Sequence, residues 1–388
     1  MSEQYDVAVI GAGVFGAWTA WHLQRAGQRV VLIDKYGPAS ARASSGGETR
    51  VIRMAYGPDA IYTRMSQRSL GKWQEFFARI ARPELFRETG VLWMAAAGDA
   101  AATQSVATLE QLGIAHAVLD TEALARRYPQ IVVPSGGWAI FEPQSGGLMA
   151  RRAVQAVVED SLRAGAELLI DNVLPPSRDA RMVDGHLADI RTEAGDAIRA
   201  ERFVFACGPW LGNVLPDVLG GRIFPTRQEV FYFGIVAGDR RFAPPAMPVW
   251  LDFGRDYYGF PDIEGRGFKL AHDVHGEAID PDSTDRLPSP PRVAHAREFL
   301  ARRFPALADA PLLGAEVCQY ENTSNGDFVI DSHPAFDNVW IAGGGSGHGF
   351  KHGPAVGELV AECMLDGRPV EPRFSLATKG TEQKREVH

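Results

Sequence analysis

The sequence predicts a fold that is α/β in one domain and α+β in the other, and three observations support this prediction. A buried strand near the N-terminus leads into a glycine motif at residues 11–16. A second buried strand ends in Asp34. Far along the chain, residues 338–343 form a third apolar run that leads into more glycines. Strands that run into glycine-rich helix starts are typical of a sheet that binds a nucleotide.

The first glycine motif predicts a dinucleotide site of the Rossmann type. Gly11, Gly13 and Gly16 permit a tight turn and a close approach to a pyrophosphate, which faces the start of a helix expected over residues 17–26. At the spacing of Asp34, a carboxylate reaches the ribose 2′-hydroxyl and disfavours a 2′-phosphate. Glycines alone also occur in ordinary helix-capping turns, but strand, helix and acid together favour FAD or NAD over NADP.

The composition limits the class of protein. With 388 residues, the chain is long enough for two domains, and 45% hydrophobic and 23% charged residues are ordinary for a globular protein. A net charge of −8 argues against a nucleic-acid partner. No signal peptide or apolar run of about 20 residues is seen, so we expect a cytoplasmic protein with no membrane partner. Cys207, Cys318 and Cys363 are too scattered for a disulfide framework or a metal site.

The nucleotide-binding domain is expected to be discontinuous. The chain leaves it after a helix over residues 61–81, through a strand over 86–94, and returns through a helix over 149–164. We predict that the domain comprises residues 1–85, 146–220 and 320–388. We predict that a substrate domain with a mixed sheet comprises residues 86–145 and 221–319. A nucleotide domain completed this late, by a second glycine-rich helix start, favours a large flavin dinucleotide.

Several distinct short motifs, spread along essentially the whole chain, indicate a resemblance to a known family. They are Gly47-Glu-Thr-Arg50 with Arg53 and Tyr56, Phe141-Glu-Pro, Arg227-Gln228, Tyr257-Tyr258-Gly, Lys269-Leu, Cys318 with Tyr320, and Gly345-Ser-Gly347-His348-Gly349-Phe-Lys351. Together with the first glycine motif, they make the chain similar to the monomeric sarcosine oxidase and N-methyltryptophan oxidase family. This family lies within the D-amino-acid oxidase-like FAD-dependent oxidoreductases.

The resemblance implies an FAD-dependent amine oxidase. Its substrate would be a secondary or N-substituted amino acid with a carboxylate, oxidised at the carbon–nitrogen bond to an imine, with O2 reduced to hydrogen peroxide. The family's cysteine that matches Cys318 is bonded to the flavin, so the resemblance implies covalent FAD. From the residues alone, a cysteine in such a strand is an inert small hydrophobe. Cys207 and Cys363 are assigned to packing.

The resemblance also assigns roles around the substrate. Arg53 and Lys351 match a clamp on the substrate carboxylate, to which a planar guanidinium is suited. Without the family, they would read as a surface salt bridge and a solvated lysine. Lys269 matches a lysine that helps O2 accept electrons, although an exposed strand lysine is the alternative.

The remaining candidates complete the predicted site. The catalytic residues are Lys269, Arg50, His348 and Tyr258, and the substrate-binding residues are Arg53, Lys351 and Tyr320. The cofactor-binding residues are Gly11, Gly13, Gly16, Asp34, Ser45, Thr49, Arg50, Val173, Cys318, Gly345, Gly347, Gly349 and Lys351. The expected partners are a small amine or amino acid and O2, and the expected state is a monomer or small homo-oligomer.

The chain differs from the family in the part of the pocket wall that would contact the amine of the substrate. The family's histidine four residues after the lysine is Asp273 here, with His272 one position earlier. The family's histidine pair is replaced by Ser45 and Gly46, and His352 stands where an aromatic residue is typical. The reaction class therefore carries over, but the substrate does not. A dehydrogenase that passes electrons to a quinone or partner protein, or a flavin-carrying subunit of a complex, remains an alternative.

Overall fold

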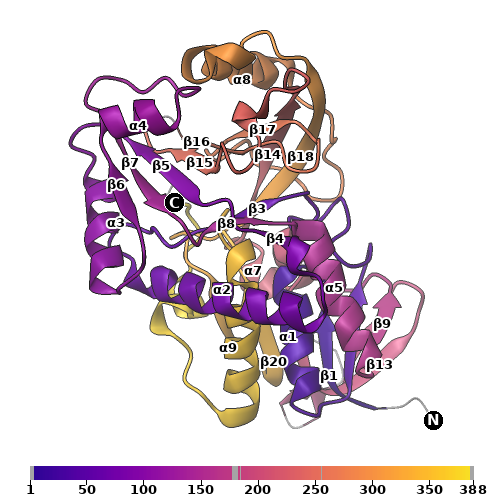
Figure 1. The fold of residues 1–388 in the computed structure, drawn as a ribbon. Coiled ribbons are helices and arrows are strands. Elements are labelled where there is room, and N and C mark those ends of the chain that lie inside the picture. The colour runs from indigo at the N-terminus through magenta and orange to yellow at the C-terminus, as the bar shows by residue number, and fades with distance from the viewer. Residues whose placement is uncertain (1–3, 177–181, 184, 255, 385–388) are drawn as a thin grey trace.

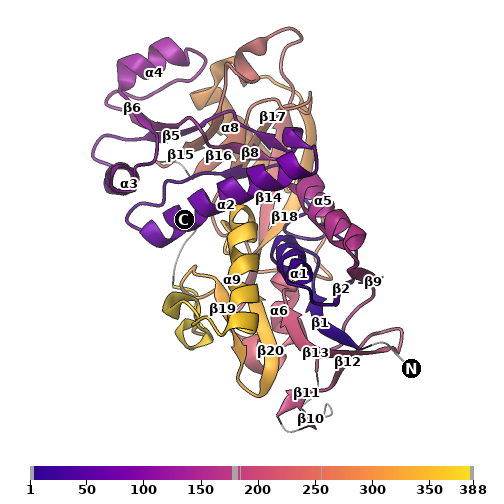
Figure 2. The ribbon, with the colours of Figure 1, turned by 60° about the horizontal axis from the view of Figure 1, so that its bottom comes forward.

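Two large sheets organise the computed structural model, which describes residues 4–176, 182–183, 185–254 and 256–384 (Figures 1 and 2). One sheet lies in the lower half of Figure 1 and the other in the upper half, with helix α2 (Ala60–Arg79) running between them. This arrangement confirms the predicted fold class, a nucleotide-binding sheet joined to a mixed sheet. In the described part of the chain, no helix is both long and apolar enough to cross a membrane.

The lower sheet has seven strands and is mainly parallel. They are β1 (Tyr5–Ile10), β2 (Val30–Asp34), β9 (Glu167–Ile170), β12 (Asp189–Arg191), β13 (Ala197–Phe205), β19 (Val329–His333) and β20 (Phe336–Gly343). Their order is β19-β20-β13-β1-β2-β9, and β12 pairs with β13. The chain leaves β1 toward β2 on one side and meets β13 on the other, so the strand order reverses at β1. Ligands bind at the carboxyl ends of strands at such a point.

Helices cover both faces of this sheet because its apolar residues alternate. Val7 and Val9 of β1 pack toward α1 (Val14–Arg25), α5 (Ala150–Arg163) and α9 (Gly353–Asp366). Ala8 and Ile10 pack toward the opposite face, where α6 (Leu211–Val214) and α7 (Pro216–Leu219) lie. Helices α1 and α9 run side by side (Figure 2). Burial on both faces is expected for parallel strands.

The upper sheet has eight strands and is mixed. They are β5 (Val91–Ala95), β6 (Ala117–Leu119), β7 (Trp138–Glu142), β14 (Phe224–Phe233), β15 (Val249–Asp252), β16 (Tyr257–Phe260), β17 (Phe268–His272) and β18 (Leu312–Asn322). Their order is β18-β14-β17-β16-β15-β5-β7-β6; β15 and β5 pair in parallel, and the other neighbouring strands described in this sheet pair antiparallel. Helix α8 (Pro290–Arg303) packs Phe299 and Leu300 into the apolar cluster on one face of this sheet.

Smaller elements complete the described chain. A three-stranded sheet contains β3 (Arg50–Ile52), β8 (Gly146–Leu148) and β4 (Phe86–Arg87), and β10 (Met182–Val183) pairs with β11 (His186–Leu187). The remaining α-helices are α3 (Ala100–Gln111) and α4 (Thr121–Arg127). The 3-10 helices are η1 (Pro83–Leu85), η2 (Gly208–Trp210), η3 (Arg240–Phe242), η4 (Pro305–Leu307), η5 (Phe350–His352), η6 (Pro372–Phe374) and η7 (Leu376–Thr378).

Two local expectations were wrong in detail. The strand expected over residues 86–94 is two strands in different sheets, because Gly90 has a φ of +73° and breaks the extended run. The first helix begins at Val14, inside the glycine motif, rather than at residue 17. Strand β9 ends at Ile170, and Val173, a predicted cofactor-binding residue, forms an isolated bridge with Thr192. The domain boundaries themselves stay a prediction.

Candidate active site

A cavity of about 250 Å³ opens at the carboxyl ends of β1 and β2. It follows the start of α1 and extends to the C-terminal glycine run, so it lies at the point where the strand order reverses. The predicted cofactor-binding residues that line it are Gly11, Gly13, Asp34, Ser45, Arg50, Val173, Gly345, Gly347 and Gly349. Gly16 and Thr49 lie behind its wall, and Cys318 and Lys351 line a second cavity.

The glycine loop is shaped by steric limits. Gly11 has a φ of +104°, and a Cβ there would lie 2.3 Å from the carbonyl oxygen of Ala206. A Cβ on Gly16 would lie 1.8 Å from the carbonyl oxygen of Gly11. The first turn of α1 therefore packs directly on the strand end, which brings the helix N-terminus to the cavity.

Asp34 both lines the first cavity, as the sequence predicted, and binds backbone N–H groups of the neighbouring loops. Its carboxylate accepts hydrogen bonds from the backbone N–H of Ala12 at 2.7 Å and of Tyr36 at 2.8 Å. Burial raises the pKa of Asp34 above its ordinary value, and the backbone N–H groups oppose this shift. Asp34 thus fastens the glycine loop and also lines the cavity, where a ribose hydroxyl can reach it.

The first cavity fits FAD. Its lining includes Lys35 and Val173, the N-terminus of α1, which would hold the pyrophosphate, and Arg50 and Tyr320, which it shares with the second cavity. Near the second glycine run, Glu321 accepts a hydrogen bond from Gly345 N at 2.9 Å. Its other carboxyl oxygen, Oε2, is buried without a partner among the described residues, so the wall offers an unused polar atom.

The other cysteines divide as follows. Cys363 lies on the buried face of α9, as expected for a packing residue. Cys207 also packs against the sheet core, but it lines the first cavity as well. Burial raises the pKa of the Cys207 thiol, and the nearby Asp34 and Glu321 add to this effect. A thiol held in its neutral form is a poor nucleophile.

The second cavity, of about 50 Å³, adjoins the first. Both are lined by Arg50, Tyr320, Gly347 and Phe350, so these residues form their common boundary. The second cavity also brings together residues from four separate segments: the predicted substrate and catalytic residues Arg53, Tyr258, His348 and Lys351, and the predicted cofactor-binding residue Cys318.

Arg50 connects the boundary to Cys318. One guanidinium nitrogen, Nη2, lies 3.3 Å from Cys318 Sγ and donates to Ser44 O at 2.8 Å, while Nη1 donates to Thr49 O at 2.9 Å. The guanidinium is therefore fixed by backbone carbonyls beside the sulfur. A permanent positive charge is thereby held beside the sulfur of Cys318.

Arg53 and Lys351 are buried in the wall of the second cavity, so the surface salt bridge and the solvated lysine are both wrong. Arg53 is 4% exposed and lies over the rings of Tyr56 and Trp93, at 4.2 and 4.5 Å. Lys351 is 3% exposed, and its Nζ donates to Tyr56 Oη at 2.7 Å and to His348 O at 3.0 Å. Burial and the Arg53 charge hold the pKa of Lys351 well below its usual range. Two buried cations facing one cavity are suited to an anion.

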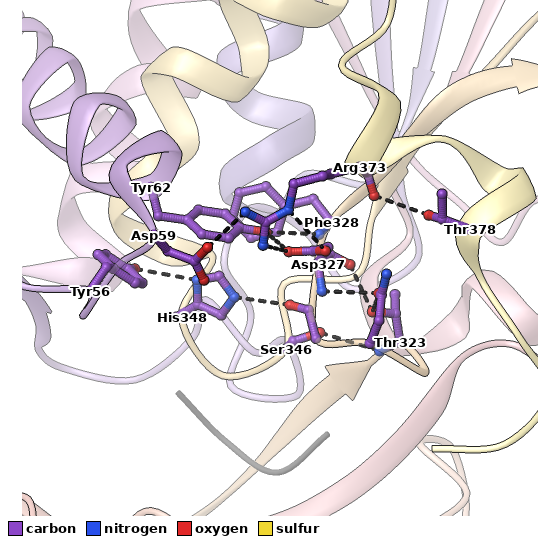
Figure 3. A network of polar contacts seen from close by, with 12 residues as sticks. Tyr56, Asp59, Tyr62, Thr323, Asp327, Phe328, Ser346, His348, Arg373 and Thr378 are labelled. Atoms are coloured by element: carbon purple, nitrogen blue, oxygen red, sulfur yellow. Dashed lines mark hydrogen bonds and ion pairs between the residues drawn. The ribbon is translucent and has the colours of Figure 1, made fainter. Parts of the chain in front are cut away.

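Polar contacts hold His348 and Tyr56 in place. Nε2 of His348 lies 3.1 Å from Gly326 O, and Nδ1 lies 3.3 Å from Tyr56 Oη. Figure 3 shows the neighbouring network, in which Arg373 joins Asp327 to Asp59 behind the His348 ring. This network ties the loop before η5 to the start of α2.

Glu142 is a residue whose role the sequence analysis missed. Its carboxylate accepts hydrogen bonds from Met54 N at 2.7 Å and Ala55 N at 3.0 Å, and it is 1% exposed. These bonds fix the backbone just after Arg53. The Phe141-Glu-Pro motif was noticed for its resemblance, but nothing in its spacing indicated which backbone it would hold.

Lys269 is fully buried, so the exposed strand lysine is also wrong. Its Nζ donates to Thr49 O at 2.8 Å and Oγ1 at 3.0 Å and lies 4.5 Å over the Phe260 ring. Burial and the Arg50 charge lower its pKa to about 7. Lys269 is not among the residues that line either cavity, and Thr49 stands between it and Arg50.

Tyr258 and Tyr320 line the second cavity from neighbouring parts of the upper sheet. Tyr320 Oη donates to Asp273 Oδ1 at 2.9 Å. Burial and Asp273 raise the pKa of Tyr258 to about 12. Asp273, which the sequence analysis treated only as a departure, is therefore part of this cavity.

Comparisons with known proteins agree with this geometry. The family model of the DAO group, described as FAD dependent oxidoreductase, matches residues 6–363. A monomeric sarcosine oxidase from Bacillus sp. (strain NS-129) is 32% identical over 95% of both chains. An N-methyl-L-tryptophan oxidase from Escherichia coli is 30% identical over 94% of this chain and 95% of that protein.

Solved structures show the same fold. An L-proline dehydrogenase from P. horikoshii superposes with a TM-score of 0.84 at 21% identity and covers 97% of this chain and 98% of that one. A fructosyl peptide oxidase from E. terrenum superposes with a TM-score of 0.81 at 22% identity, over 96% of this chain and 92% of that one. With the full-length family match and the cavity that fits FAD, the chain belongs to the DAO family of FAD-dependent oxidoreductases.

Proposed function

We propose that this protein oxidises the carbon–nitrogen bond of a secondary or N-substituted amino acid to an imine and passes the electrons to O2. The observation that carries the proposal is the pair of buried cations, Arg53 and Lys351, in a small cavity that adjoins the cofactor cavity. The relatives named for sarcosine and N-methyl-L-tryptophan act on N-methyl amino acids. Such substrates carry a carboxylate, which two cations could bind.

The side chains of the second cavity would orient the substrate. Arg53 presents a planar fork to the carboxylate, and Lys351 adds a point charge beside it. Both side chains are buried, which strengthens their contacts with an anion. FAD, when bound, supplies the hydride acceptor for the carbon next to nitrogen. With the carboxylate held, that carbon faces the boundary formed by Arg50, Tyr320 and Gly347, and positioning supplies much of the acceleration.

The roles toward FAD and O2 belong to the same proposal. Cys318 would hold the flavin through a thioether, because its sulfur lies 3.3 Å from the Arg50 guanidinium at the boundary of the two cavities. Acid precipitation should then leave the yellow colour with the protein, and Cys318→Ser should release it. Lys269, held by Thr49 behind that boundary, would stabilise charge that develops on O2.

An anaerobic titration tests the proposal. The purified holoenzyme is titrated with sarcosine, other N-methyl amino acids, proline, pipecolate and iminodiacetate while the flavin absorbance is recorded. Bleaching by one of these, followed by rapid recovery and peroxide release in air, supports the oxidase. Bleaching with slow recovery in air, accelerated by a quinone, would support a dehydrogenase instead. No bleaching across the panel would contradict the proposed substrate class.

A further inference from the structure

The second cavity contains an acid that the carboxylate clamp does not use. Asp273 follows β17 and lines this cavity together with Arg53 and Lys351. Among the described residues, it forms no ion pair within 4.0 Å. The other lining acid, Glu229, is already paired with Arg227 Nε at 2.8 Å and accepts a bond from Ser289 N at 2.8 Å. Asp273 is therefore the acid with acceptor capacity left for a ligand.

The contacts of Asp273 leave one carboxyl oxygen available. Oδ1 accepts the Tyr320 hydroxyl at 2.9 Å, which fixes the carboxyl group, while no hydrogen bond to Oδ2 is found among the described residues. Burial raises the pKa of Asp273 to about 6, although the Tyr320 bond and the charges of Arg53 and Lys351 oppose this shift. Near neutral pH, a carboxyl group of this kind can both hold and release a proton.

The charges of the cavity match a zwitterion. An amino acid enters with a carboxylate, for which Arg53 and Lys351 are suited, and with an ammonium group that carries the opposite charge. An ammonium buried without an acceptor would be costly. The ammonium must also lose a proton before the adjacent carbon can give up hydride, since the nitrogen lone pair forms the new double bond. Both needs call for an acid in the same cavity as the clamp.

We propose that Asp273 binds the ammonium group of the substrate and accepts a proton from it. In this step, one N–H bond breaks, its electron pair stays on nitrogen, and an O–H bond forms on the Asp273 carboxylate. The proposal deepens the proposed function and rests on it. The resemblance places a histidine at this position in the sarcosine oxidases, so the acid is a feature of this chain.

Other groups face Asp273 and take part in any pH response. These groups come from each element packed against Asp273. The sheet contributes Tyr320 of β18 and Tyr258 of β16, and the neighbouring segments contribute Arg53 after β3, Lys351 in η5, His348 before η5, Asp256 before β16 and His272, which precedes Asp273 in sequence. Burial and the Asp273 charge hold the pKa values of both tyrosines above their usual range. Below the pH at which they ionise, Asp273 is the carboxyl group of this cavity that changes charge, and Lys351, whose pKa is lowered by burial, is the basic group whose charge can also change.

The test compares Asp273→Asn with the wild-type holoenzyme. Anaerobic stopped-flow measurements give the rate of flavin reduction by the best substrate of the panel, from pH 6 to pH 10. At pH 7, we expect Asp273→Asn to reduce the rate by roughly 100-fold, because a proton acceptor contributes about that factor. At high pH, where the free amine is abundant in solution, the two rates should approach each other. Asp273→Glu keeps an acid and should keep the shape of the wild-type profile.

Two controls separate a chemical role from a structural one. Asp309→Asn changes an exposed aspartate after η4 that lines neither cavity, and should leave the profile unchanged. Methoxyacetate has a carboxylate and an ether oxygen but no ammonium. Its dissociation constant is measured from the flavin spectrum. The values for the wild type and Asp273→Asn should agree within about twofold, because sites that do not interact change each other's binding free energy by only a few tenths of a kcal/mol.

The outcomes are distinct. If the wild type is bleached and Asp273→Asn loses activity by the same factor at every pH, or loses none, the proton role of Asp273 is wrong. Equal loss of methoxyacetate binding in Asp273→Asn would also overturn it, because the damage would then be structural. If no amino acid of the panel bleaches the wild type, the proposed function itself fails, and the role of Asp273 fails with it.

Discussion

The two adjoining cavities are built in different ways. The first contains the two glycine runs of the nucleotide-binding sheet, and a turn at Gly11 brings the N-terminus of α1 to it. The second is lined by charged and aromatic side chains that come from distant segments, such as Arg53 after β3 and Lys351 in η5. A cofactor common to a large family can be held by local backbone geometry, whereas a substrate is read by side chains that only the tertiary fold brings together.

The largest expected effect breaks the first cavity. Gly11→Ala places a Cβ about 2.3 Å from Ala206 O at a φ of +104°, so the loop must move and FAD retention should be lost. Gly27→Ala is the matched control, because its φ is +84° but nothing lies within 4 Å of the new Cβ. The control should lose only about 1–2 kcal/mol of stability. Flavin-to-protein absorbance ratios measure both, and full FAD occupancy in Gly11→Ala would contradict the account.

The next effect concerns the boundary between the cavities. Lys269→Met should slow reoxidation of the reduced flavin by roughly 100-fold or more while flavin reduction changes little, because a buried charge near the reacting oxygen is lost. Lys379→Met is the control, since Lys379 is also buried and donates to Arg373 O at 2.8 Å in another part of the molecule. Equal slowing of both half-reactions in Lys269→Met would show that Lys269 is only structural.

A third change weakens the second cavity. Arg53→Met should raise the KM for carboxylated substrates by about 100-fold, since removing one partner of a buried charged contact costs about 3 kcal/mol. Arg127→Met removes an exposed arginine that also stacks on an aromatic ring, Phe141 at 4.1 Å, and should leave KM unchanged. Steady-state kinetics decide the matter, and an unchanged KM in Arg53→Met would remove this residue from the clamp.

The smallest expected effect is a pH-dependent change in stability that arises from Glu321 in the wall of the first cavity. Burial raises the pKa of Glu321 from 4.5 to about 7, so the charged form is disfavoured in the folded protein. Its contribution to stability is present below pH 4.5 and is lost as the pH rises to about 7, by on the order of 2–3 kcal/mol. Glu321→Gln should therefore gain melting temperature relative to the wild type at pH 8 but not at pH 4.5. The exposed Glu298→Gln should show no such difference, and a pH-independent gap would contradict the assignment.

Much of the first cavity could be predicted from the sequence because its signals are local. The spacing from Gly11 to Asp34 depends on one strand, one helix and one strand, and the structure brings both residues to the same cavity. The second bond of Asp34, to Ala12 N, could not be predicted, because it depends on how the turn closes.

The second cavity depended on the resemblance rather than on local pattern. Nothing near Lys351 in sequence indicates that it would be buried beside Tyr56, which is far away along the chain. The role of Glu142 was missed for the same reason. Its partner Met54 follows β3 and is far from Glu142 in sequence. Likewise, Asp273 could be noticed as an unusual residue, but its meeting with Tyr320 needs the pairing of the upper sheet.

The central claim is that the two cavities form one site that meets at Arg50, Tyr320 and Gly347. The most direct measurement is a titration of the oxidised holoenzyme with methoxyacetate, followed by flavin absorbance and by calorimetry. The account predicts a saturable change of the flavin spectrum with the same dissociation constant as the heat signal, and the loss of both in Arg53→Met. Binding by calorimetry without any change of the flavin spectrum would show that the anion binds away from the cofactor and would contradict the account.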